Sequence, residues 1–328
     1  MSVMSKFSMM VNNIEINYSK SYPIFKYLYL LTAFSSILSI SHAANKKTYP
    51  ASAFDQSTLK LEEGFKVNAK VKILIIPGDE SVNKPSGNHE YMAGASLLAK
   101  IFNNLEKVHA SISNYDWPKN EKLLDQADVI VIYSNGDGKQ GLLLSKERIL
   151  KIDKLVDKGV GFVNLHASIC YPNVFVPLGQ KWIGGVWTKE YSNGNRGHWK
   201  SSHSQFPKHA VTSGVTPWSA DDGWCHKILI PEGSRQGINP LLWSSKEHKG
   251  DPKGGDKDIV AWTFDRLDGG RSFSCSGAHE HWEWANNGLR KMIVNGILWT
   301  AKQEVPPQGF NCKIDKENMN QHFDKRKN

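Results

Sequence analysis

The chain has 328 residues and a formal net charge of +9 at neutral pH. Residues 1–43 carry three lysines and one glutamate, so +7 remains on the rest of the chain. This excess is scattered: acids and bases alternate through residues 145–158, and the stretch from residue 313 carries both signs. Because a nucleic-acid-binding domain presents a clustered basic face, the charge pattern argues against a nucleic-acid partner.

The first 43 residues predict a cleavable secretory signal peptide. Residues 27–40 form an apolar run that follows Lys26, and Ser41 and Ala43 place small residues at the −3 and −1 positions of a cleavage site. The run is too short for a comfortable membrane span, although an uncleaved N-terminal anchor is the alternative. We expect cleavage after Ala43, a periplasmic or secreted protein, and no stable membrane span in the mature chain.

After a polar linker over residues 44–70, strand and helix patterns alternate. Continuous apolar runs, typical of strands buried on both faces, occur at residues 71–76, 129–133 and 161–165, with a weaker strand at 109–113. Helical periodicity covers residues 91–105 and 145–157, and Ser145 is placed to cap the second helix. This order predicts a doubly wound, mostly parallel α/β sheet of the flavodoxin-like type.

The second half of the chain has shorter and less periodic signals. Residues 182–270 are rich in Gly, Pro and Trp and predict a loop-rich lid over the carboxyl edge of the sheet, with strands at 226–230 and 258–264. A turn at 265–270 leads into a strand at 271–276, which predicts a hairpin. A closing helix at 289–301 ends the domain, which we place at residues 71–305. The polar tail, 306–328, is expected to be disordered from residue 313.

The segment with the densest group of titratable and aromatic side chains follows the strand predicted at 271–276. Two imidazoles, two carboxylates and two indoles fall within residues 279–284, and ligands in open α/β sheets bind beyond the carboxyl ends of strands. His279 and His281 are two residues apart, so an extended segment would point both to one face. His279 and His281 could ligate a divalent metal together with His166 or with His89 and Glu90 of the first loop. Proton transfer, substrate binding and a purely structural role remain open alternatives.

Other patterns narrow the chemistry. His166 occupies the turn after its strand where α/β hydrolases place a nucleophile, and neither Ser168 nor Cys170 has the surrounding pattern of one. The sequence has no GxGxxG after the first strand and no Walker loop, which argues against nucleotide chemistry. The four cysteines permit one or two disulfides in an exported protein, without favouring a pair.

Several motifs together resemble the trehalose-utilisation (ThuA-like) family, whose fold is that of class I glutamine amidotransferases. In chain order they are GNHEY (87–91), GVGFVNLHAS (159–168), WIGG (182–185), GHWK (197–200), KHAVTSGV (208–215), DDGWCH (221–226), VAWT (260–263), GGRSFSCSGAHEHWEW (269–284) and RKMIVNGILWTA (290–301). The resemblance covers residues 71–305. It departs from the family at Asp222, where an acidic pair is expected before an aromatic, and at Ala210, where proline is common.

The resemblance implies a fold more firmly than a reaction. His166 stands where amidotransferases carry cysteine, so glutamine hydrolysis is not expected, although His281 and Glu283 keep their His-x-Glu spacing. The family is associated with trehalose and related disaccharides and with their 3-keto derivatives. It therefore implies proton abstraction next to a ketone, giving isomerisation, elimination or hydrolysis.

From the residues and the resemblance we expect an exported carbohydrate-processing enzyme whose partner is a small sugar. A non-catalytic sugar-binding module and a metal-dependent hydrolase are the alternatives, and the oligomeric state is left open. No cofactor is certain, and a divalent metal is one candidate. The expected catalytic residues are His166, His281 and Glu283. Substrate contacts are expected from His89, Glu90, Gly184, Gly185, His198, Asp222, His279 and Trp282, and the candidate metal ligands are His89, His166, His279 and His281.

Overall fold

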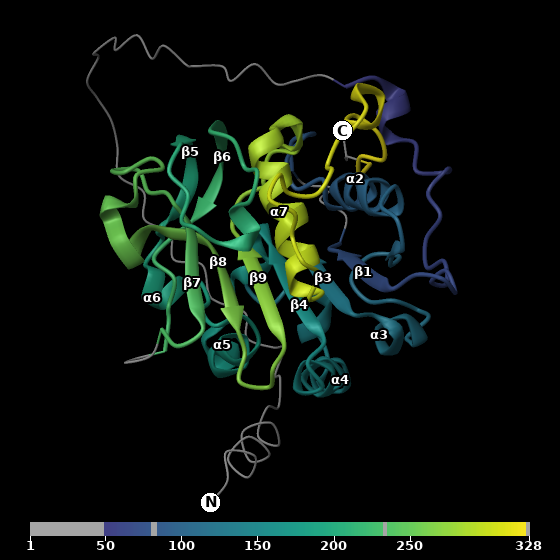
Figure 1. Cartoon of the computed structure of the whole chain (residues 1–328), viewed down its shortest axis with the longest axis horizontal. Helices are drawn as coiled ribbons and strands as arrows, with labels where there is room; N and C mark the ends of the chain where they lie inside the picture. The colour runs from purple at the N-terminus through teal and green to yellow at the C-terminus, as the bar shows by residue number, and fades with distance from the viewer. Residues whose placement is uncertain (1–48, 80–83, 232–234, 326–328) are drawn as a thin grey trace, which may run out of the picture. The chain divides into compact units, whose positions relative to one another are not determined.

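The computed structural model describes residues 49–79, 84–231 and 235–325 (Figure 1), so the predicted signal peptide and its cleavage site lie outside it. The described residues belong to one compact unit. Its centre is a seven-stranded sheet in the order β2-β1-β3-β4-β9-β8-β7. The strands are β1 (Val71–Pro77), β2 (Val108–Ile112), β3 (Val129–Tyr133), β4 (Gly161–Leu165), β7 (Ile238–Trp243), β8 (Ile259–Asp265) and β9 (Arg271–Cys275).

Five neighbouring strands, from β2 to β9, run parallel, and β8 pairs antiparallel with both β9 and β7. The predicted mostly parallel sheet and the predicted hairpin of β8 and β9 are therefore confirmed. Parallel strands need crossover connections, and the helices in these are α2 (Tyr91–Asn103), α3 (Lys122–Gln126), α4 (Lys146–Asp157) and α5 (Val176–Ile183). The helix α7 (Asn287–Thr300) follows the last strand. Ser145 caps α4 as expected, because its side chain accepts a hydrogen bond from the Arg148 amide.

Helices cover both faces of the sheet because alternate residues of the buried strands point to opposite sides. Ile73, Val131 and Val163 pack in one core with α2 and α7, which lie together over the near face in Figure 1. On the opposite face, the ring of Phe162 contacts Trp182 of α5, with ring centroids 5.5 Å apart. The Trp182 indole donates to Asp153, which holds α5 beside α4.

The lid contains an antiparallel ribbon of β5 (Arg196–His203) and β6 (Trp218–Cys225), next to the short helix α6 (Lys189–Ser192). The strand predicted at 226–230 is wrong: Leu229 forms a single bridge with Val186 there, and the pairing belongs to the residues before it. The ribbon escapes prediction because β5 is mostly polar. It still alternates, burying Trp199, Ser201 and His203 while intervening residues face solvent.

The C-terminal tail is ordered as far as it is described, so the expectation of disorder from residue 313 is wrong. Phe323 is fully buried against Ala53 and Ala93, and the Tyr115 hydroxyl and Gln56 amide both donate to Asp324. One aromatic anchor and a few backbone contacts hold a segment whose composition is otherwise typical of a solvated tail. Within the described ranges, no helix combines the length and apolar character needed to cross a membrane.

We expect His203 to make the fold sensitive to acid. Its ring lies 4.2 Å from that of Trp218, and burial lowers its pKa to about 3. In the unfolded chain the pKa of this histidine is near its ordinary value of about 6.5. Between pH 6.5 and pH 3 the unfolded chain therefore binds more protons than the folded protein. Stability is lost as pH falls through this window, by up to about 1.4 kcal/mol per pH unit. His203→Phe keeps the ring without the titration, so urea unfolding at pH 7, 6 and 5 should show a flatter decline. An unchanged decline would contradict this.

Candidate functional site

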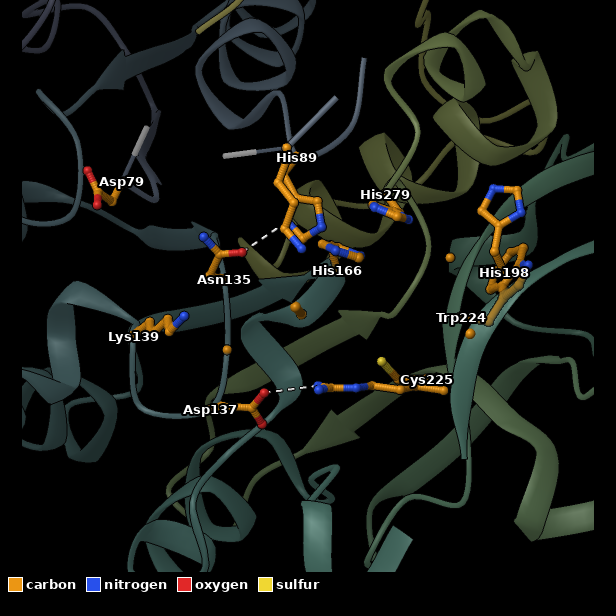
Figure 2. A pocket seen from close by; sticks show the side chains of 16 residues that line it. Asp79, His89, Asn135, Asp137, Lys139, His166, His198, Trp224, Cys225 and His279 are labelled. Atoms are coloured by element: carbon orange, nitrogen blue, oxygen red, sulfur yellow. Dashed lines mark hydrogen bonds and ion pairs between the residues drawn. The ribbon is translucent and has the colours of Figure 1, made fainter. Parts of the chain in front are cut away.

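The carboxyl ends of four parallel strands meet at one cavity of about 590 Å³. The residues that follow β1, β3, β4 and β9 supply one wall, and the β5–β6 ribbon supplies the opposite wall (Figure 2). The lining consists of Asp79, Lys84, His89, Asn135, Gly136, Asp137, Lys139, His166, Ala167, Arg196, Gly197, His198, Gly223, Trp224, Cys225 and His279. The predicted lid thus forms part of the site rather than only covering it.

Three of these residues form what we call the three-histidine cluster: His89, His166 and His279. One ring nitrogen of each lies within 4.8 Å of the others. The rings of His166 and His279 are stacked with centroids 5.0 Å apart, and the His89 ring stands edge-on to both. Figure 2 shows the three rings grouped beside Asn135. The cluster brings together three segments that are far apart in the sequence.

The backbone is held in unusual conformations at each member of the cluster. His89 and His166 both have φ of 55°, and Ala278, which precedes His279, has φ of 68°. Non-glycine residues rarely adopt this left-handed region, and such residues gather at functional sites. The His89 amide also donates to the His279 carbonyl, which ties two of the three segments together.

The cluster is electrostatically suited to a cation. Burial, and then repulsion from His89 and His279, holds the pKa of His166 well below its ordinary value, and burial lowers that of His279 to about 3. The rings of His166 and His279 are therefore neutral at neutral pH, which is the form that binds metal. The buried Nε2 of His166 has no hydrogen-bond partner in the described part of the chain. Such an atom is costly to bury unless something binds it.

The spacing also fits a metal after a small adjustment. Nitrogens that bind zinc tetrahedrally at 2.0–2.1 Å lie about 3.4 Å from one another. The nitrogens of the cluster, at up to 4.8 Å from one another, would need to approach by up to about 1.4 Å to reach this spacing. The Nδ1 of His89 makes hydrogen-bond contacts with Asn135 and Tyr91, and these contacts fix the orientation of the ring in the cluster. Three protein ligands with an open position are typical of catalytic rather than structural zinc.

Asp222 builds the loop that carries His279. Its buried carboxylate accepts hydrogen bonds from the backbone amides of Ala278, His279 and Glu280, at 2.7, 2.9 and 2.9 Å. Burial raises the pKa of Asp222 to about 7, although these bonds act in the opposite direction. The neighbouring Gly223 must lack a side chain, because a Cβ there would lie 2.2 Å from Nδ1 of His279.

His198 faces the cavity from β5 between two carboxylates. Its Nδ1 lies 3.3 Å from Asp221 and its Nε2 lies 3.2 Å from Glu280. Glu280 is buried, accepts a hydrogen bond from Asn88, and also lies 3.7 Å from Nδ1 of His279. Burial raises the pKa of Glu280 to about 8, so His198 lies between a buried carboxylic acid and the exposed Asp221 carboxylate.

Besides Asp222 and His281, five predicted site residues lie outside the cavity lining. Glu90 is buried and accepts from the amides of Gly87 and Asp324, so it braces the loop before His89. Trp282 packs under that loop at Gly87. Gly184 ends α5 with φ of 82° against Phe264, and Gly185 packs on Ile228. Glu283 accepts from the Asp221 amide. Each of these residues shapes the polypeptide around the site.

His281 is the largest correction. The segment is not extended there, because a 3₁₀ helix begins at His281 and runs to Ala285. Its ring turns away from His279, donates from Nε2 to the Met319 carbonyl and meets Phe323 edge-on. The prediction that His281 shares a face and a metal with His279 is therefore wrong. Its polar partner comes from the C-terminal segment that was expected to be disordered.

The sequence analysis missed several cavity residues, among them Asn135, Asp137, Lys139, Arg196 and Cys225. The first three directly follow β3, so the rule that selected His166 after β4 could have selected them. Arg196 pairs with Asp137 at 2.9 Å and stacks over Trp187. Arg196 and Cys225 lie on the β5–β6 ribbon, whose strands were not predicted.

Comparisons with known proteins agree with this architecture. A family model described as ThuA, trehalose utilisation, matches residues 81–300. A ThuA-like protein from Bacteroides uniformis superposes with a TM-score of 0.53 at 16% identity, over 75% of this chain and 97% of its own. A second ThuA-like protein, from Parabacteroides merdae, superposes with a TM-score of 0.47 at 17% identity, over 76% of this chain and 99% of its own. PurLQS from Thermotoga maritima superposes with a TM-score of 0.41 at 11% identity, over 71% of this chain and 98% of its own. No match was found among curated proteins.

Proposed function

The chain belongs to the trehalose-utilisation (ThuA) family, and from this premise we propose that it is an exported carbohydrate-processing enzyme with a divalent metal at the three-histidine cluster. The single observation that carries the proposal is the convergence of the three imidazoles of His89, His166 and His279. Burial lowers the pKa of His166, and its buried Nε2 has no hydrogen-bond partner among the described residues. A sugar-binding module without catalysis would not need such a group.

The cavity suits a polyhydroxylated ligand. Its lining is rich in groups that bond hydroxyls, including Asn135, Asp137 and Lys139, with Trp224 as an aromatic surface. Its volume of about 590 Å³ lies within the usual range for small-molecule sites. The family description points to trehalose, so a disaccharide or its keto derivative is the proposed substrate class.

The proposed reaction is proton abstraction next to a ketone on the sugar ring. A divalent cation at the cluster would polarise the ketone oxygen and stabilise the charge that develops on it. His198 would remove the proton from the neighbouring carbon, with Glu280 and Asp221 orienting its ring. Returning the proton to another carbon gives isomerisation, whereas protonating a departing glycosidic oxygen gives elimination.

The test is turnover of a panel of disaccharides and their 3-keto forms by the protein from Ala44 onward, with and without chelator. We expect turnover that chelator removes, and a loss of about 10²- to 10⁴-fold in kcat for His198→Gln with metal content unchanged. His248→Gln is the matched control, because His248 lies outside the cavity lining. Sugar binding without turnover of any panel member would favour the binding-module alternative, and chelator-resistant turnover would refute the metal's role.

A further inference from the structure

Two cysteines meet at the wall of the cavity. Cys170 and Cys225 are 55 residues apart in the sequence, yet their sulfurs lie 3.9 Å apart. Both side chains are buried, and Cys225 also lines the cavity. The other two cysteines, Cys275 in β9 and Cys312 near the C-terminus, are buried elsewhere as free thiols.

The local structure holds this pair together from both sides. Cys170 ends the turn that starts at His166, and its carbonyl accepts from the amide of Asp137 and the side chain of Gln140. Gly136 leaves the space that Cys170 occupies, because a Cβ on that glycine would lie 2.6 Å from Cβ of Cys170. Cys225 is the last residue of β6 and pairs with Arg196 of β5.

We propose that Cys170 and Cys225 form a disulfide that joins the His166 turn to the β5–β6 ribbon. Sulfurs in a disulfide lie about 2.05 Å apart, so the two side chains need to approach by about 2 Å in total. The disulfide would join the two walls of the cavity. One wall carries His166, and the other carries Gly223, which packs against His279. Formation of this disulfide in the cell rests on the proposed export, because disulfides persist in oxidising compartments. It does not depend on the metal.

The chemistry is thiol–disulfide exchange with a small disulfide such as oxidised glutathione. Cys225, which the oxidant can reach through the cavity, loses its proton and attacks the oxidant, releasing one thiolate and forming a mixed disulfide. Cys170 then loses its proton and displaces the second thiolate. Two protons and two electrons leave the protein, and the oxidant is reduced to two thiols. Burial raises the pKa of Cys170, so little of this thiol is in the thiolate form at neutral pH.

The test is peptide mapping under non-reducing conditions after incubation of the purified protein with oxidised glutathione. We expect one link, between Cys170 and Cys225, while Cys275 and Cys312 still react with an alkylating reagent after unfolding. The double variant Cys275→Ala/Cys312→Ala should form the same link. Alkylation of all four cysteines after oxidation, or a link that involves Cys275 or Cys312, would overturn the proposal.

Thermal unfolding gives a second readout. Typical disulfide contributions predict that the oxidised protein melts about 5–7 °C above the reduced protein. Cys225→Ala should abolish the difference between oxidising and reducing conditions, whatever its own melting temperature. Equal melting temperatures of oxidised and reduced wild-type protein would count against the link. Because the purified protein is oxidised in vitro, failure of export and failure of metal binding leave this result unaffected.

Discussion

His166→Ala is expected to abolish metal binding and turnover together. The substitution removes the most buried ligand of the three-histidine cluster, and two remaining imidazoles cannot hold a catalytic ion in place. Because losing even an outer-shell partner of a metal ligand costs 10- to 100-fold in affinity, loss of a ligand itself should cost more than about 100-fold. Metal affinity is measured by titration calorimetry on chelator-treated protein, and turnover on the keto-sugar panel.

The fold should survive this substitution. Within the described structure, the ring of His166 makes one hydrogen bond, a 3.3 Å contact of its Nδ1 with the Ser276 carbonyl, and burying its neutral form carries a penalty that alanine does not. His248→Ala, which changes a histidine outside the cavity lining, should leave both readouts at the wild-type value. Metal affinity within a factor of three of wild type in folded His166→Ala protein would remove His166 from the proposed site.

Asp222→Ala is expected to lower the free energy of unfolding by roughly 3–5 kcal/mol. The carboxylate serves four backbone amides, those of Gly223, Ala278, His279 and Glu280. Alanine leaves these buried donors without acceptors, and each unsatisfied donor costs about 1–3 kcal/mol before the loop relaxes. Displacement of His279 should also weaken metal affinity by about 10- to 100-fold. Denaturant unfolding and metal titration measure the two effects.

Asp221→Ala is the matched control for stability, because the exposed Asp221 side chain accepts no backbone amide of the His279 loop. Its expected change is within about 0.5 kcal/mol. Asp222→Asn keeps one acceptor oxygen and should fall between the two. If Asp222→Ala were as stable as Asp221→Ala, the loop would be held by something other than this carboxylate.

The parallel half of the sheet was predictable because its strands are buried on both faces. Continuous apolar runs such as residues 129–133 have no competing helical period, and the helix over 146–157 carries its own cap at Ser145. The β5–β6 ribbon was not predictable in the same way. In β5, residues that face solvent alternate with residues that face the protein interior, and Ser, His and Lys occur among them, so the strand lacks an alternation of apolar and polar residues.

The candidate site was predictable where the sheet positions it and not where tertiary contacts do. His166 and His279 follow parallel strands, so the topology alone brings them to one edge. The prediction for His281 is wrong because a 3₁₀ helix begins at this residue and its ring donates a hydrogen bond to the Met319 carbonyl. This partner lies 38 residues away in the sequence, so no local pattern indicates it. Asp222 was predicted as a substrate contact, but its contacts with the loop after β9 depend on the ribbon, which was not predicted. The position of Cys225 at the end of β6 depends on the same ribbon.

The most direct test of the account is the stoichiometry of zinc binding to the chelator-treated protein from Ala44 onward, measured by calorimetry at neutral pH. The account predicts one tight site per chain that is lost in His166→Ala and retained in His248→Ala. Absence of a tight site in the wild-type protein, or a site of equal affinity in His166→Ala, would contradict a metal centre at His89, His166 and His279.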